Sequence, residues 1–191
     1  MDERPDDVLV ELAKRGGAEA FSELARRHQQ RIYRLIFGMT RNHSDTDDLT
    51  QEVFLTAFKS IPGFRGTAGF YTWIYRIAVN LTLNFLRRRG REKQGAEYHD
   101  HILYSDVAAA GASSPEGGSM RNELRGRIAE AVDSLPPHFK TSFLLVADQG
   151  MSHADAAKVL GCSENTVSWR MHKARKLLQA RLKPYLSEVG S

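Results

Sequence analysis

The stretch GFYTWIYRIAVNLTLNFLRRRG, residues 69–90, constrains the fold more than any other part of the chain. Its apolar residues recur at the three- and four-residue steps of an α-helix, but they occupy two opposite sides of that helix. The narrow strip between these sides, called the polar stripe below, consists of Trp73, Arg76, Asn80, Asn84, Arg87 and Arg91. We therefore expect a helix wedged between neighbouring helices, with only the polar stripe facing solvent.

The polar stripe suits contact with unpaired nucleic acid. Aromatic rings stack on bases, amides hydrogen-bond base edges, and arginines neutralise phosphates. A buried helix with an asparagine-lined polar seam would show the same pattern, so the stripe alone leaves both interpretations open.

The residues before this stretch also show helical periodicity. Apolar residues over 18–39 form one face of a long helix, and those over 49–61 form a second face that ends at Pro62. Ser44, followed by Asp47 at capping-box spacing, is the expected N-cap of the second helix.

Beyond residue 120 the pattern is again helical, with helices expected over 124–135 and 139–147. Since no segment shows strict alternation or a hairpin signal, the fold class is all-α. Residues 95–120 carry four acids and no Lys or Arg, and they are small, Gly- and Ser-rich and without periodicity. We therefore expect two small helical domains, residues 1–93 and 121–191, joined by a flexible acidic linker over 94–120. A loop packed in a groove is the alternative, although structureless loops of this length are uncommon inside one domain.

Residues 152–182 have the features of a helix-turn-helix. Ser152 is placed to cap a short helix, Gly161 supplies the left-handed residue of the turn, and Ser163 is placed to cap a longer helix. Ala157 allows the two helices to cross closely, and Val167 fixes the second helix on the first. The second helix would then enter a DNA groove. A generic helical hairpin with a basic surface is the alternative.

The outward face of this second helix carries side chains suited to duplex DNA. Asn, Ser and His reach base edges, whereas Lys and Arg suit phosphates. The predicted contacts are Asn165, Thr166, Ser168, Trp169, His172, Lys173 and Arg175. The opposite, core-forming face is expected to be Val167, Met171, Ala174 and Leu178.

Charge is distributed unevenly along the chain, whose formal net charge is +4. Residues 64–95 hold seven Arg or Lys against one acid, and residues 155–185 hold seven against two, whereas the first 55 residues hold eleven acids against eight bases. Two separate basic segments suggest a polyanion contacted at two places. Basic residues that only solvate helix faces would give the same counts.

Several classes of protein find no support in the sequence. The single cysteine, Cys162, cannot form an internal disulfide or a four-cysteine zinc site, and a small space-filling role explains it best. His99 and His101 lie in the linker without a neighbouring cysteine, and no Gly-rich phosphate loop or Ser/His/Asp grouping occurs. We therefore expect no enzymatic activity, no cofactor and no metal. The polar N-terminus and the lack of a long apolar run favour a cytoplasmic protein.

The chain resembles a group IV, or extracytoplasmic-function (ECF), RNA polymerase sigma factor of bacteria, in the branch typified by sigma-E. The stretches that carry the resemblance are DTDDLTQEVFLTAFKSIPGFRG, FYTWIYRIAVNLTLNFLRRRGR and, after the linker, SLPPHFKTSFLLVADQGMSHADAAKVLGCSENTVSWRMHKARKLL. They cover about residues 18–93 and 121–184. The resemblance implies sigma region 2 in the first half, sigma region 4 in the second, and a function in promoter-specific transcription initiation.

The resemblance also implies roles for individual residues. The residues that would dock on the β′ clamp helices of core RNA polymerase are Asp47, Asp48, Gln51, Glu52 and Leu55. The residues that would melt and read the −10 promoter element are Arg65, Phe70, Tyr71, Trp73, Arg76, Asn80, Asn84 and Arg87. The loop FRGTAGFYT at 64–72 would form part of a pocket for an extruded base. The second helix of the helix-turn-helix would read the −35 element, and region 4 would also touch the β flap.

Two places depart from the family pattern. Ser168 and Trp169 stand where Arg and Ser are common, and His172 stands where an aromatic residue can occur, so the resemblance predicts a docking mode but no −35 sequence. TDD at 46–48 replaces the commoner Ala-Glu-Asp and keeps its charge.

A further implied partner is an anti-sigma factor, which in the family is often membrane-anchored. The flexible link also allows the two domains to pack on each other and hide both DNA surfaces, which their opposite charges make reasonable. Two other classes stay open: a stand-alone helix-turn-helix regulator that binds symmetric half-sites without polymerase, and a helical protein-interaction module that binds little DNA.

Overall fold

The structure is a computed structural model that describes residues 4–94 and 120–189. In this part of the chain every regular element is a helix and no strand occurs, which confirms the all-α fold class. Most of the predicted linker, with His99 and His101, lies outside the described residues. None of the described helices combines the length and the hydrophobicity that crossing a membrane requires.

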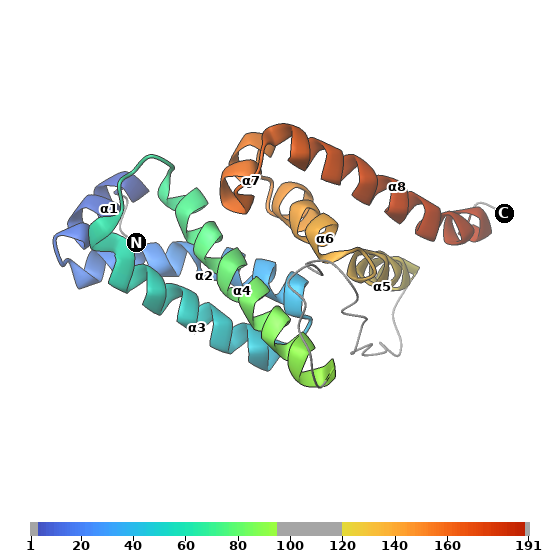
Figure 1. Cartoon of the computed structure of the whole chain (residues 1–191), viewed down its shortest axis with the longest axis horizontal. Helices are drawn as coiled ribbons and strands as arrows, with labels where there is room; N and C mark the ends of the chain where they lie inside the picture. The colour runs from blue at the N-terminus through green and yellow to red at the C-terminus, as the bar shows by residue number, and fades with distance from the viewer. Residues whose placement is uncertain (1–3, 95–119, 190–191) are drawn as a thin grey trace.

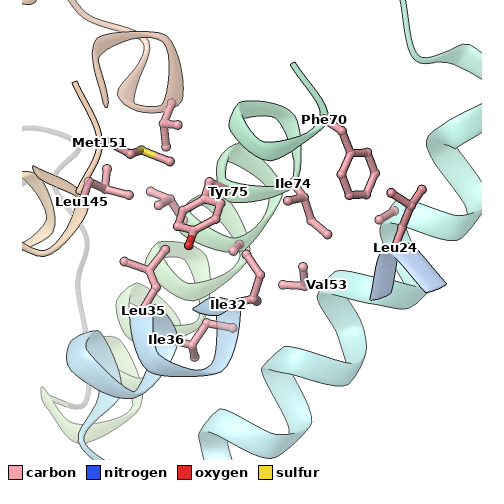
Figure 2. Close-up of a cluster of buried hydrophobic side chains, with 14 of the residues drawn as sticks. Leu24, Ile32, Leu35, Ile36, Val53, Phe70, Ile74, Tyr75, Leu145 and Met151 are labelled. Atoms are coloured by element: carbon pink, nitrogen blue, oxygen red, sulfur yellow. The ribbon is translucent and has the colours of Figure 1, made fainter. Parts of the chain in front are cut away.

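The first half is a bundle of α-helices with one turn of 3-10 helix (Figure 1). Its elements are α1 Asp6–Lys14, α2 Ala18–Thr40, α3 His43–Ser60, η1 Ile61–Gly63 and α4 Phe70–Gln94. Helices α2, α3 and α4 pack against one another, and α1 packs on α2, η1 and α4. Between them lie fully buried side chains, among them Leu24, Ile32, Val53 and Ile74 (Figure 2).

Helix α1 was not expected from the sequence. Pro5 precedes it with extended backbone, and Asp6 and Asp7 occupy its first turn, where their charge suits the helix dipole. These are ordinary start signals. The helix buries only Leu9, Val10 and Ala13, however, so its apolar pattern is too short to reveal a periodicity.

The turn between α2 and α3 corrects one prediction. Arg41 adopts the left-handed conformation with φ of +54°, and the side chain of Asn42 accepts a hydrogen bond from the backbone N of Asp45 at 2.9 Å. Asn42, and not Ser44, is therefore the N-cap of α3. Ser44 lies inside the first turn, and its capping-box spacing to Asp47 has no capping role.

The second half contains the elements α5 Met120–Asp133, α6 Pro137–Phe143, the π-helix η2 Leu144–Asp148, α7 His153–Leu160 and α8 Glu164–Val189. The predicted helix-turn-helix is confirmed as α7 and α8. Ser152 Oγ accepts from Asp155 N at 3.0 Å, Gly161 has φ of +64°, and Ser163 Oγ accepts from Thr166 N at 3.1 Å. The predicted core-forming face of α8 is buried as expected: Val167, Met171, Ala174 and Leu178.

The helix expected over 139–147 begins earlier and ends in a π-helix. Gln149 N donates to Leu144 O at 2.9 Å, five residues back, where an α-helix would use the carbonyl four residues back. Sequence periodicity does not separate the two hydrogen-bond patterns over a single turn.

The two halves share one hydrophobic core. Leu145 and Met151 of the second half are buried with Leu35, Ile36 and Tyr75 of the first half (Figure 2). Helix α4 packs along α7, and η2 packs on α2. An ion pair at 2.7 Å joins Arg41 Nε at the end of α2 to Asp133 at the end of α5. The packing of the two domains on each other, expected from the sequence as one possibility, is the arrangement that the structure adopts, and it is called the closed arrangement below.

Candidate nucleic-acid interface

The polar stripe lies on the open side of α4. Its members Arg76, Asn80, Asn84, Arg87 and Arg91 are exposed, and Trp73 is half-buried. The buried residues that flank the stripe are Thr72, Ile74, Tyr75, Ala78, Val79 and Thr82. Asn84 Oδ1 accepts a hydrogen bond from Arg87 at 3.2 Å, so these two side chains support each other at the surface. The structure therefore has the wedged helix and the solvent-facing strip that the sequence predicts.

A cavity of about 230 Å³ lies where the polar stripe begins. Its lining residues are Gly63, Phe64, Arg65, Thr67, Ala68, Thr72, Trp73, Arg76 and Lys158. The rings of Phe64 and Trp73, with centroids 4.9 Å apart, give it an aromatic wall. Arg65 and Arg76 add positive charge, and within residues 4–94 and 120–189 no ion pair neutralises either of them. An aromatic wall beside two arginines suits a stacked base and its phosphate.

Two of the predicted contact residues lie behind this cavity. Phe70 is only 5% exposed; it packs edge-on against Phe64 and His28 and at a tilt against Trp73, with centroids 5.3–6.5 Å away. The hydroxyl of Tyr71 donates to the backbone O of Gln149 at 3.3 Å, across the contact between the two halves. In the closed arrangement Phe70 therefore supports the aromatic wall of the cavity, and Tyr71 takes part in the contact between the two halves.

Charged side chains of α1 and α2 form an ionic cluster next to Phe70. Asp6 lies 2.6 Å from Nε2 of the buried His28 and 2.8 Å from Nη1 of Arg27. Partial burial acts to raise the pKa of Asp6, but the hydrogen bonds with His28 and Arg27 outweigh it and lower the pKa below 3.8. Helix α1 is thereby fastened to α2, whose His28 packs edge-on against Phe70.

A second, more open cavity of about 370 Å³ lies further along α4. Leu81, Asn84, Arg87, Arg88 and Arg91 line it. The sequence-based contact set omitted Arg88, because the helical wheel places it just outside the polar stripe. Its exposure beside Arg87 and Arg91 widens the positive surface of the stripe at this end of α4.

The helix-turn-helix divides its predicted DNA contacts into two groups. Asn165, Trp169, His172, Lys173 and Arg175 are exposed on α8. The Ser168 hydroxyl instead lies 2.8 Å from Nδ1 of His153, and the Thr166 hydroxyl lies 2.8 Å from that of Ser163. The first group is available to a ligand, whereas the second group also ties α8 to α7 and to the turn, with Ser168 still exposed.

The acidic face of α3 is open along its whole length. Asp47, Asp48, Gln51, Glu52 and Leu55 are all exposed, with Leu55 at 52%. Phe58, one turn further on, is also about half exposed and packs edge-on against Phe21 at 5.1 Å. The sequence reasoning missed Phe58, although its spacing of three residues from Leu55 was visible. This face offers carboxylates flanking two apolar side chains, which suits a basic protein partner.

The contact between the halves reaches the cavity itself. Lys158 of α7 lines the cavity, and Arg76 Nη2 lies 3.9 Å from the position that a Cβ on Gly161 would take. Behind this contact, Tyr75 Oη donates to Gln149 Oε1 at 2.7 Å. Burial, followed by a hydrogen bond with Tyr71, raises the pKa of Tyr75 far above its usual value. The start of the polar stripe is therefore next to the helix-turn-helix.

Sequence comparison assigns a family to each half of the chain. Sigma-70 region 2 matches residues 24–92, and Sigma-70 region 4 matches residues 125–178. The RNA polymerase sigma-H factor of Pseudomonas aeruginosa is 32% identical over 192 residues, covering 99% of this chain and all of that protein. The ECF RNA polymerase sigma-E factor of Escherichia coli K12 is 32% identical over 185 residues, covering 95% of this chain and 96% of that protein.

Two solved structures have a similar fold. CnrH in complex with the cytosolic domain of CnrY superposes with a TM-score of 0.69 at 25% identity, covering 94% of this chain and 97% of that one. The sigma factor RpoE in complex with the anti-sigma factor NepR from Bartonella quintana gives a TM-score of 0.69 at 22% identity, covering 87% and 98%.

Proposed function

This chain belongs to the extracytoplasmic-function family of RNA polymerase sigma factors, and from that premise we propose how its residues share the work of transcription initiation. As an alternative sigma factor it directs core RNA polymerase to a set of promoters. It acts by binding in the bacterial cytoplasm, while the polymerase performs the chemistry. The first domain, residues 1–93, binds polymerase and the −10 element, and the second, residues 121–191, binds the −35 element.

The polar stripe and the cavity at its start read the unpaired −10 strand. This assignment rests on one observation: an exposed row of Arg and Asn leads into a cavity walled by Phe64 and Trp73 and flanked by Arg65 and Arg76. Opening a duplex costs about 1–2 kcal/mol per base-pair step. Stacking one captured base on an aromatic side chain returns about 1–3 kcal/mol. One captured base therefore offsets only one or two steps, and the polymerase supplies the rest.

The exposed face of α8 reads the duplex −35 element. Its Lys and Arg residues contact phosphates and fix the orientation of the helix, while Asn165, Trp169 and His172 lie over the bases. The acidic, partly apolar face of α3 docks on the β′ clamp helices. Docking can precede DNA binding, because that face is uncovered in the closed arrangement.

The closed arrangement cannot occupy both promoter elements at once. Their names place the elements about 25 base pairs apart, which is about 85 Å of B-form DNA at 3.4 Å per pair. In the structure α7 touches α4, which carries the polar stripe. The halves must therefore separate before initiation. The 25 residues from 95 to 119 can span about 80–90 Å when fully extended, which is enough.

The closed arrangement prevents initiation because it holds the two DNA-binding surfaces too close together to reach both promoter elements. It does not cover those surfaces. The polar stripe and the outward face of α8 remain exposed. The expectation that packing of the domains hides both DNA surfaces is therefore met only at the cavity, which Lys158 helps to line. An anti-sigma factor that stabilises the closed arrangement would keep the chain inactive. RpoE of Bartonella quintana forms a complex with the anti-sigma factor NepR, and CnrH forms one with the cytosolic domain of CnrY; for this chain we propose a membrane-anchored anti-sigma factor.

Run-off transcription with core polymerase and a promoter library tests the proposal. Asn80→Ala and Arg76→Ala should reduce strand opening, seen as permanganate reactivity of unpaired thymines, while promoter binding through the −35 element persists. Gln29→Ala, which removes an exposed side chain of α2, is the matched control. Binding to symmetric half-sites without polymerase would instead indicate a stand-alone regulator, and weak, salt-independent DNA binding would indicate a protein-interaction module.

A further inference from the structure

Trp169 is 53% exposed, the largest value for an apolar side chain in the part of α8 up to Tyr185. It lies in the second turn of the helix, four residues after Asn165 and three before His172, so the three side chains share one face. An indole left this open costs free energy in water unless a ligand covers it. Its position is where a helix-turn-helix contacts base edges, near the start of the second helix.

The orientation of the Trp169 ring is set by neighbours on two sides. The ring of Phe139 in α6 packs edge-to-face against it, with centroids 5.6 Å apart and planes at 61°. Phe139 is itself anchored, because it packs on the small core of the second half and on the ring of His138 at 4.0 Å. Lys173 Nζ lies over the Trp169 ring at 6.0 Å from its centroid. With these neighbours in place, the ring is held before DNA arrives while the residue stays 53% exposed.

The hydroxyl groups beside Trp169 are already committed to the fold. Ser168 pairs with His153, and Thr166 pairs with Ser163. Among the described residues, Asn165, Trp169 and His172 are the exposed side chains of this face of α8 that such pairing leaves untouched. Of these three, Trp169 offers mainly an apolar surface, with a single N–H donor and no acceptor.

One group in the major groove matches an apolar edge. Thymine carries a C5-methyl group there, whereas the other bases present hydrogen-bond donors and acceptors. Resting on the proposed role of α8 at the −35 element, we propose that Trp169 is a specificity-determining residue that reads the methyl group of one thymine in that element. A relative with a serine at this position lacks the apolar surface, so this contact gives the chain a −35 preference of its own.

The test uses holoenzyme formed from the full chain and core polymerase, bound to a promoter selected from the library. Each thymine of the −35 element is replaced in turn by deoxyuridine, which removes only the methyl group. At one position we expect binding to weaken about fourfold, which corresponds to about 0.8 kcal/mol for one methyl group. The same replacement should have no effect on holoenzyme carrying Trp169→Ala, and a reduced effect on holoenzyme carrying Trp169→Phe.

Ile128→Ala is the matched control, since it removes another exposed apolar side chain of the second half and should leave the uracil effect intact. The deoxyuridine replacements are first tested with holoenzyme that contains the unmodified chain, so poor folding of a variant cannot obscure that result. If no thymine is sensitive while Lys173→Ala and Arg175→Ala weaken promoter binding, α8 still reads the −35 element and the Trp169 inference is wrong. If those two variants and Trp169→Ala all bind normally, the proposed −35 surface itself is wrong.

Discussion

Gly38 of α2 and Leu144 of η2 approach so closely that a Cβ on Gly38 would lie 3.0 Å from both δ carbons of Leu144. A glycine in the middle of a helix costs roughly 0.5–1 kcal/mol relative to alanine. Here it allows the second half to approach the backbone of the first. The pair therefore marks a place where a large side chain at residue 38 would act on the closed arrangement.

Gly38→Leu should separate the two halves. Rotation of Leu144 can absorb a single methyl group, but a leucine side chain overfills the contact, and overpacking costs about 1–3 kcal/mol. That cost would shift the equilibrium toward the separated form by about 5- to 150-fold. Small-angle scattering of the free protein would show a larger radius of gyration. Gly126→Leu is the control, because it also replaces a helical glycine but no other atom lies within 4 Å of its Cβ. Equal radii for the two variants would contradict the prediction.

A disulfide at the same place should lock the closed arrangement. A Cβ at residue 38 would lie 3.6 Å from Cγ of Leu144, close to the position that a cysteine sulfur would take. Gly38→Cys with Leu144→Cys, in a Cys162→Ser background, should lose at least tenfold of its promoter-specific transcription on oxidation and regain it on reduction. Cys162→Ser alone should be insensitive to oxidation. Full activity of the oxidised double-cysteine protein would show that the halves need not separate.

We predict that the free energy of unfolding decreases at alkaline pH, because the hydroxyl of Tyr75 is buried and hydrogen-bonded to Gln149. Because burial raises the pKa of Tyr75 in the folded protein, its contribution to the free energy of unfolding is complete below about pH 10, the pKa of an exposed tyrosine. As pH rises above 10, the unfolded chain loses the proton and the folded chain keeps it, so that contribution decreases.

Denaturant unfolding of the wild type and of Tyr75→Phe between pH 9 and pH 11 measures this effect. The wild type should lose more stability than Tyr75→Phe over that interval, since lysine titration is common to both proteins. Parallel pH profiles would mean that the hydroxyl of Tyr75 is as accessible in the folded chain as in the unfolded one.

The sequence predicted the parts of the structure that depend on local chemistry. Ser152, Gly161 and Ser163 each act on backbone within three or four residues, so their spacing was enough to place α7 and α8. The polar stripe was equally predictable, because a helix repeats its faces every 3.6 residues. Asn42 and Ser44 show the limit of such signals, since both residues are good caps and only the left-handed Arg41 decides between them.

Contacts distant in sequence were beyond this reasoning. Nothing near Lys158 indicates that it lines a cavity formed by residues 63–76, because the contact depends on how two separate bundles pack. The contacts of Phe70 and Tyr71 show the same limit. Both are aromatic residues of a stretch predicted to bind a base, and the sequence does not reveal that Phe70 packs against His28 or that Tyr71 donates to the backbone O of Gln149.

Lys158→Glu should stabilise the closed arrangement. In the structure Lys158 adds a third positive charge to a cavity that already holds Arg65 and Arg76, and it is paired only at the surface, with Asp155 at 3.1 Å. A carboxylate there would attract both arginines. Two exposed pairs of this kind contribute about 0.4–2 kcal/mol together, so initiation at limiting polymerase should fall about two- to thirtyfold.

The effect should weaken as salt is raised from 0.05 to 0.5 M, because screening acts strongly on exposed charges. Lys158→Ala separates the two contributions, since it removes the repulsion without adding an attraction and should fall between wild type and Lys158→Glu. Once the halves separate, residue 158 no longer lies beside the cavity, so strand opening by preformed open complexes should be the same for all three proteins. If Lys158→Glu is still defective in preformed open complexes, or if its defect does not respond to salt, then Lys158 acts by contacting promoter DNA and not through the closed arrangement.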